Sequence, residues 1–115
     1  MTYNLFIDDE RWPSDATWAE WYGVRDEWTV ARSWGEVREL IDTLGVPVFI
    51  SFDHDLGDEA VYLNGYEIAQ QIVEHDMDGK WEIPANFEFA VHSQNPIGKQ
   101  NIEALLRNYI AQKRS

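Results

Sequence analysis

Three short apolar runs, each followed at once by acidic or histidine residues, constrain the fold of this chain more than any other feature. They occupy residues 3–7, 48–52 and 87–91. In the second run, Val48, Phe49 and Ile50 stand on consecutive rather than alternate positions. That pattern is typical of a strand in a parallel sheet, because helices cover both faces of such a sheet. The runs therefore predict a buried parallel sheet with polar residues gathered at its strand ends.

Segments with helical periodicity separate these runs. A further strand is predicted at residues 28–31, so the chain alternates strands and helices. Cap residues predict helices that begin after Ser33, Asn64 and Asn95. Gly45 and Asp78-Gly79 are expected to end the first two helices. The apolar stripe of the last helix, at helical spacing, is Ile102, Leu105, Leu106, Tyr109 and Ile110.

The alternation of strands and helices predicts a single α/β domain over residues 1–115. Right-handed crossovers join parallel strands in such a fold, and we expect a four-stranded sheet in the order 2-1-3-4 within a three-layer sandwich. Ligands of open α/β sheets bind beyond the carboxyl ends of the strands, where the strand order reverses. We therefore expect the site between the first and third strands.

The charge of the chain limits its partners. Lys and Arg number 9 against 21 Asp and Glu, which gives a net charge of −12. Extended binding to the backbone of a nucleic-acid duplex is not expected, since such binding depends mostly on basic side chains. A small phosphorylated ligand held through a metal is compatible with this charge, and so is a protein partner with a basic surface. The chain has no cysteine, no secretory signal pattern and no membrane-length apolar run, so we expect a cytoplasmic location.

Titratable side chains follow three of the predicted strands. They are Asp8 and Asp9, then Asp53, His54 and Asp55, and then His92. Because the carboxyl ends of parallel strands share one edge, we expect these side chains to converge, and close carboxylates need a cation to offset their repulsion. Mg²⁺ or Mn²⁺ suits such a site. Each acid taken alone could be a turn residue, but the gathering of all of them at the ligand-binding edge favours a site.

The residues allow a division of roles. Asp9 and Asp53 would hold the metal with Asp8 in support, and Asp55 would either add a ligand or orient His54. The predicted proton-transfer groups are His54 and His92, in an order that the residues leave open. The predicted phosphate anchor consists of Ser93, Asn95 and Lys99 at the start of the last helix. Ser93 and Asn95 could instead serve only as helix caps.

Four sequence segments carry a resemblance to known families. They are LFIDDERWP at 5–13, SFDHDLG at 51–57, NGYEIA at 64–69 and VHSQNPIG at 91–98. The chain resembles the response-regulator receiver domain, which is flavodoxin-like. On that comparison, Asp8 and Asp9 match the acidic metal pocket, Asp53 the phosphoacceptor and Ser93 the Ser/Thr position. The receiver's fifth strand, with its lysine, has no counterpart here.

A closer resemblance is to the cyclic-phosphate-processing receiver domains, small proteins common in phages and bacteria. That resemblance implies a receiver fold adapted as a phosphoesterase acting on cyclic phosphates, at RNA ends or in cyclic nucleotides. The resulting hypothesis is a metal-dependent phosphoesterase. Two alternatives stay open: a binding module that captures the same ligand without turnover, and an acidic inhibitor or interaction protein of the phage type.

Overall fold

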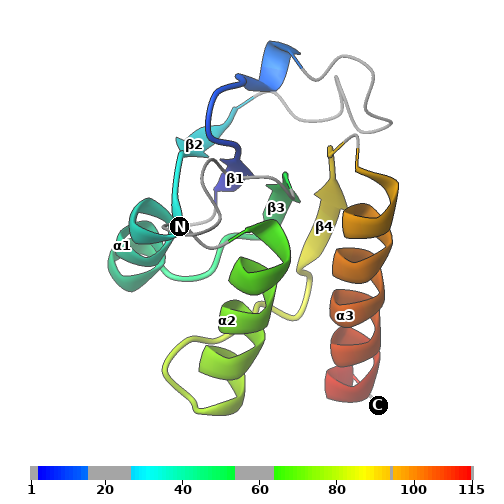
Figure 1. Ribbon diagram of the computed structural model, residues 1–115. Helices are drawn as coiled ribbons and strands as arrows, with labels where there is room; N and C mark the ends of the chain where they lie inside the picture. The colour runs from blue at the N-terminus through cyan, green and yellow to red at the C-terminus, as the bar shows by residue number, and fades with distance from the viewer. Residues whose placement is uncertain (1–2, 16–26, 54–63, 94, 115) are drawn as a thin grey trace.

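The computed structural model describes residues 3–15, 27–53, 64–93 and 95–114 (Figure 1). Its strands are β1 (Asn4–Ile7), β2 (Thr29–Ala31), β3 (Phe49–Phe52) and β4 (Glu88–Val91). Its helices are α1 (Trp34–Leu44), α2 (Gly65–Met77) and α3 (Pro96–Arg114), with the short 3-10 turn η1 (Pro13–Asp15) after β1. Each strand lies within one residue of its predicted bounds.

The four strands form one parallel sheet in the order β2-β1-β3-β4. The predicted order 2-1-3-4 and the receiver-like α/β fold class are therefore confirmed. The order reverses between β1 and β3, so the expected ligand edge lies beyond the ends of these two strands.

Cap residues start and stop the helices as the sequence predicts. The Ser33 hydroxyl accepts a hydrogen bond from the Glu36 N–H, and Asn64 forms a capping box with the residue three positions on. Gly45 ends α1 at a φ of 85°, a left-handed conformation that glycine adopts without strain. The Asn95 Oδ1 atom accepts from the Gly98 N–H at 3.0 Å, so Asn95 caps α3.

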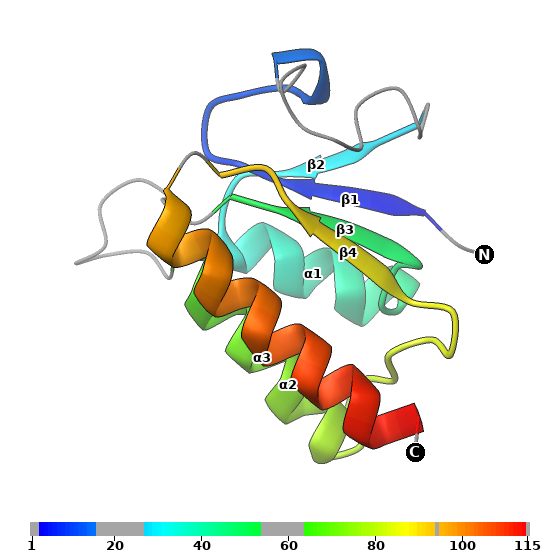
Figure 2. The same ribbon diagram turned by 90° about the vertical axis from the view of Figure 1, so that its right-hand side faces the viewer.

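The helices α1, α2 and α3 pack on the same side of the sheet (Figure 2), so the described residues form two layers and not the predicted three-layer sandwich. The difference arises because the described part of the connection between β1 and β2 contains only the short turn η1. Apolar side chains from α1, α2 and α3 form one cluster with alternate strand residues such as Leu5, Ile50 and Val91. The intervening strand residues face the other way. On that opposite face, Trp28 packs edge-on against Phe6 and Phe49, with ring centroids 5.9 and 5.8 Å away. Asp8 lies two positions after Phe6, so its side chain points to this opposite face as well.

No helix among the described residues is both long and apolar enough to cross a membrane.

Candidate functional site

The strand register brings three titratable residues into one row. Ile7 of β1 pairs with Phe52 of β3, and Phe52 pairs with Val91 of β4. The next residue in each strand is Asp8, Asp53 or His92. Successive residues of a strand point to opposite faces, so these three side chains share the face opposite the one on which α1, α2 and α3 pack.

Backbone hydrogen bonds extend the sheet ladder through this row. The Asp53 N–H donates to the Ile7 carbonyl at 3.0 Å, and the His92 N–H donates to the Phe52 carbonyl at 2.9 Å. The Asp8 N–H likewise donates to β2, at the Ala31 carbonyl. The three side chains therefore project from rigid strand ends rather than from loops.

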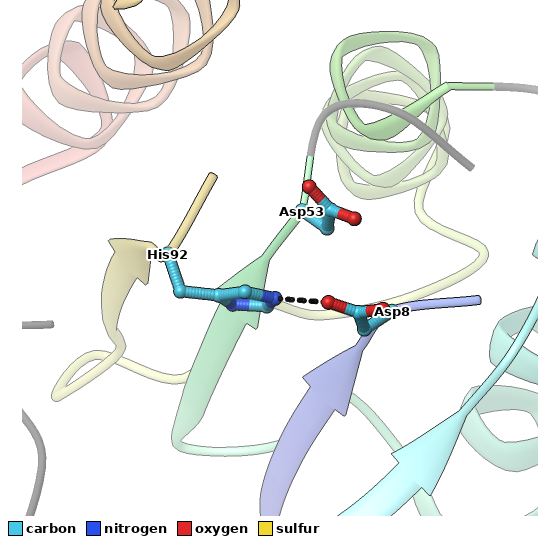
Figure 3. Close-up of side chains that lie close together, drawn as sticks. All are labelled: Asp8, Asp53 and His92. Carbon is cyan, nitrogen blue, oxygen red and sulfur yellow. Dashed lines mark hydrogen bonds and ion pairs between the residues drawn. The ribbon is translucent and has the colours of Figure 1, made fainter. Parts of the chain in front are cut away.

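The side chains of Asp8, Asp53 and His92 converge beyond the ends of β1, β3 and β4 (Figure 3). One ligand atom from each lies within 4.8 Å of the others. All three residues are buried: Asp8 and His92 are 0% exposed and Asp53 is 4% exposed. Burying two carboxylates is costly unless charge and hydrogen bonds offset them, so their partners decide what the site can do.

The Asp8 carboxylate is held by donors on both oxygens. Its Oδ1 atom accepts from the N–H groups of Glu10 and Arg11, and its Oδ2 atom accepts from His92 Nε2 at 3.0 Å. Burial pushes the pKa of Asp8 upward, but these hydrogen bonds and the Arg11 charge outweigh it and leave the pKa well below its ordinary value. Asp8 is therefore ionised throughout the physiological pH range.

Arg11 follows β1 and its side chain contacts both carboxylates of the candidate site. Its Nε atom lies 2.9 Å from Asp8 Oδ2, and its Nη2 atom lies 3.3 Å from Asp53 Oδ2. Burial lowers the pKa of Arg11, but the two carboxylates outweigh it and raise the pKa above its ordinary value. Arg32 fixes the loop by donating from Nη1 to the backbone carbonyl oxygens of Arg11 (2.6 Å) and Asp8 (3.1 Å).

His92 uses both ring nitrogens inside the protein. Its Nε2 atom faces Asp8, and its Nδ1 atom lies 2.7 Å from the hydroxyl oxygen of Ser51, which is also 0% exposed. The ring stacks on Phe6 at 4.2 Å. Burial lowers the pKa of His92 and the Arg11 charge acts in the same direction, although Asp8 opposes both. Neutral His92 then donates from Nε2 to Asp8 and accepts the Ser51 proton at Nδ1.

Ser51, His92 and Asp8 are hydrogen-bonded in series, like the serine, histidine and aspartate of a catalytic triad. The position of Ser51 nevertheless rules it out as a nucleophile. A nucleophile must reach the substrate, whereas Ser51 lies in the middle of β3 and is fully buried. The network therefore positions His92 rather than activating Ser51.

The donor set fits a divalent cation. Carboxylate oxygens suit Mg²⁺ and Mn²⁺, and an imidazole nitrogen is an additional ligand for Mn²⁺. The Ser51 hydroxyl can accept as well as donate, so it also satisfies the tautomer of His92 in which Nδ1 carries the proton and Nε2 presents its lone pair. Asp8, Asp53 and His92 would then be the ligands.

The structure brings together some of the predicted site residues and leaves others apart. Within the described residues, Asp9 is half-buried and outside the metal-binding group, because it follows Asp8 and has the opposite parity. His54 and Asp55 lie outside the described residues. His92, predicted as a proton-transfer group, belongs to the group of three residues that could hold a metal ion, so its predicted role stays a prediction.

The predicted phosphate anchor lies next to His92 and also has a structural role. Ser93 is 6% exposed, and its hydroxyl accepts from the Asn95 N–H at 3.1 Å. Asn95 caps α3, and Lys99 is half-buried on the first turn of that helix. Both the capping and the anchor interpretations are thus compatible with this geometry.

Two residues that contact the candidate site were not predicted from the sequence, namely Arg11 and Ser51. Ser51 carried a signal, because a polar residue inside an apolar parallel strand must find a buried partner. Arg11 carried a weaker one, as the single basic residue in the acidic segment 8–15.

Comparisons with known proteins agree with the fold. A family model described as the cyclic-phosphate processing receiver domain matches residues 3–108. No curated protein matches the chain in sequence. A solved structure, described as a yeast Spc42 trimeric coiled coil fused to another structure, is 17% identical with a TM-score of 0.56. That match covers 89% of this chain and 62% of the solved one, and it supports the fold alone.

Proposed function

The chain belongs to the cyclic-phosphate processing receiver domain family, and from this premise we propose that it is a metal-dependent phosphoesterase acting on a cyclic phosphate. The substrate would be an RNA-end 2′,3′-cyclic phosphate or a cyclic nucleotide. One observation carries the proposal: two carboxylates and an imidazole are buried in one row at the point where the strand order reverses. Receiver domains use this edge of the sheet for their acidic metal pocket.

The charges of the pocket favour a cation there. Asp8 and Asp53 have ligand oxygens within 4.8 Å, and two unit charges at that separation repel by about 3 kcal/mol at an effective dielectric of 20. The guanidinium of Arg11 supplies one positive charge, so with neutral His92 the pocket keeps a net negative charge. A divalent cation bound there would polarise phosphoryl oxygens and lower the pKa of a bound water.

The chain's own residues supply position and polarity. The ladder bonds of Asp53 and His92 fix the two side chains relative to each other, which keeps a bound phosphate in one orientation. Ser93 directly follows His92 and α3 begins at Pro96, so the proposed phosphate anchor starts next to His92 in the chain.

The test is a panel of 2′,3′-cyclic and 3′,5′-cyclic phosphates, incubated with Mg²⁺ or Mn²⁺ and in parallel with a chelator. Wild-type protein should hydrolyse at least one member, and the chelator should abolish turnover. Asp53→Asn should lower kcat/KM more than about 100-fold, because it removes a charged metal ligand. Asp78→Asn makes the same charge change at an exposed position and should leave turnover unchanged.

Hydrolysis that persists in the chelator would contradict the metal dependence, and no turnover of any member would contradict the enzyme. A binding module is the second candidate, favoured by one observation: both nitrogens of His92 are engaged inside the protein. Calorimetry that detects tight, metal-dependent binding of a cyclic phosphate without product would support that function instead.

A further inference from the structure

We propose that Arg11 is a resident counter-cation of the candidate metal site, which competes with the divalent cation for Asp8 and Asp53. This inference rests on the proposed function, since it concerns how the same pocket takes up its metal. It assigns to Arg11 a role in setting metal affinity.

The guanidinium of Arg11 contacts the carboxylate oxygens that a metal ion would need as ligands. Its Nε atom contacts Asp8 Oδ2 at 2.9 Å, and its Nη2 atom contacts Asp53 Oδ2 at 3.3 Å. Asp8 and Asp53 also contribute their carboxylate oxygens to the metal-binding group. A dication among these oxygens would repel the guanidinium, so the ion pairs and full metal coordination exclude each other.

The Arg11 side chain is more exposed to solvent than the two carboxylates that it contacts. It is 28% exposed, whereas the side chains of Asp8 and Asp53 are 0% and 6% exposed. The guanidinium can therefore leave for solvent while the carboxylates, fixed by the strand ladder, stay in place.

The backbone at Arg11 is held independently of its side chain. The Arg11 N–H donates to Asp8 Oδ1 at 2.8 Å, and its carbonyl accepts from Arg32, whose guanidinium lies 4.4 Å from the centre of the Trp12 ring. Release of the side chain would thus leave the loop anchored. Without metal, the same side chain offsets charges that would otherwise be buried uncompensated.

The experiment measures Mn²⁺ affinity by calorimetry and by the rise in melting temperature, in the full chain. Arg11→Gln should bind Mn²⁺ about tenfold more tightly than wild type, because it removes a competitor held by charge-assisted hydrogen bonds. Arg38→Gln, an exposed position on α1 with the same charge change, should alter the affinity less than about twofold.

A second variant, Arg11→Lys, keeps the inference testable if Arg11→Gln fails to fold. Its ammonium keeps the charge but cannot bridge both carboxylates with a planar fork, so its Mn²⁺ affinity should lie between those of wild type and Arg11→Gln. A folded Arg11 variant with unchanged or weaker Mn²⁺ affinity would overturn the inference. An Arg11→Gln chain that folds only when Mn²⁺ is added would support it.

The two proposals fail in different ways. Mn²⁺ binding that tightens in Arg11→Gln, without hydrolysis by either protein, contradicts the enzyme and leaves the competition intact. Metal-dependent hydrolysis with the same Mn²⁺ affinity in both proteins contradicts the competition alone.

Discussion

Replacing Ser51 with alanine tests the buried network that orients His92. The Ser51 hydroxyl lies 2.7 Å from His92 Nδ1, and both residues are 0% exposed, so solvent cannot take the place of the lost hydroxyl. The imidazole nitrogen would be left buried without its partner. Such a loss costs about 1–3 kcal/mol, which corresponds to a fall in melting temperature of about 4–12 °C for a domain of this size.

The assay is urea and thermal unfolding of the metal-free protein, followed by titration with Mn²⁺. In Ser51→Ala, Mn²⁺ affinity should fall about 10- to 100-fold, since the residue that holds a ligating histidine sets its tautomer and orientation. Ser51→Thr retains the hydroxyl and should recover most of the Mn²⁺ affinity, although its extra methyl group costs stability in a packed strand. Ser14→Ala, an exposed serine in η1, is the matched control and should change neither property.

Nitrogen NMR of the His92 ring separates positioning from simple packing. Metal-free wild type should show the proton on Nε2, the atom facing Asp8, and Ser51→Ala should keep that tautomer but shift the Nδ1 resonance, because Nδ1 loses its hydrogen bond. A Ser51→Ala protein with wild-type stability, wild-type Mn²⁺ affinity and an unaltered Nδ1 resonance would refute the reasoning.

Two further predictions concern the framework that supports the site. Burial raises the pKa of Asp76, but hydrogen bonds from the Ile83 N–H, Lys113 and Tyr109 outweigh this effect and lower the pKa. Asp76→Asn should therefore lower the free energy of unfolding by about 1–3 kcal/mol at pH 7, measured by urea unfolding. Because a lowered pKa stabilises the fold only above the unfolded value, that difference should shrink below about pH 4, and a constant difference would contradict it. Asn64→Ala should destabilise the protein by about 1 kcal/mol in the same assay by removing the α2 cap, while Asn108→Ala, exposed on α3, should not.

The strand order and the edge that carries the site could be predicted because they depend on coarse features. Apolar runs at residues 3–7, 48–52 and 87–91 locate the strands within a residue. Right-handed crossovers then place all carboxyl ends at one edge, whichever way individual side chains turn. The gathering of the polar residues that follow the strands at one edge comes from these two steps, and the observed register then selects Asp8, Asp53 and His92.

The choice between Asp8 and Asp9 depends on a finer feature. A shift of one residue in the pairing of two strands exchanges the faces that their side chains share, and the sequence patterns predicted the strand ends but not the pairing. The observed register pairs Ile7 with Phe52, which gives Asp8 and Asp53 the same parity. The sequence prediction had placed Asp9 at the metal with Asp8 in support.

Arg11 and Ser51 could not be assigned because their roles depend on partners distant in sequence. Ser51 contacts a residue 41 positions away, across neighbouring strands. Arg11 bridges Asp8 with Asp53, which belong to different strands and come together only when the sheet forms. A local sequence pattern carries no information on contacts between residues so far apart in the chain. Both assignments therefore needed the strand register and the conformation of the turn after β1.

The burial of His92 changes how proton transfer in the proposed reaction can be assigned. A general acid or base must come within hydrogen-bond reach of the reacting group, but both His92 nitrogens face protein partners and the residue is 0% exposed. The sequence holds two other histidines. His75 lies on α2, where it stacks on Trp81 and bonds to the Gln71 carbonyl. His54 directly follows Asp53 in the sequence, so it is the histidine that we expect to transfer the proton in the proposed reaction, while His92 and Asp53 would hold the metal.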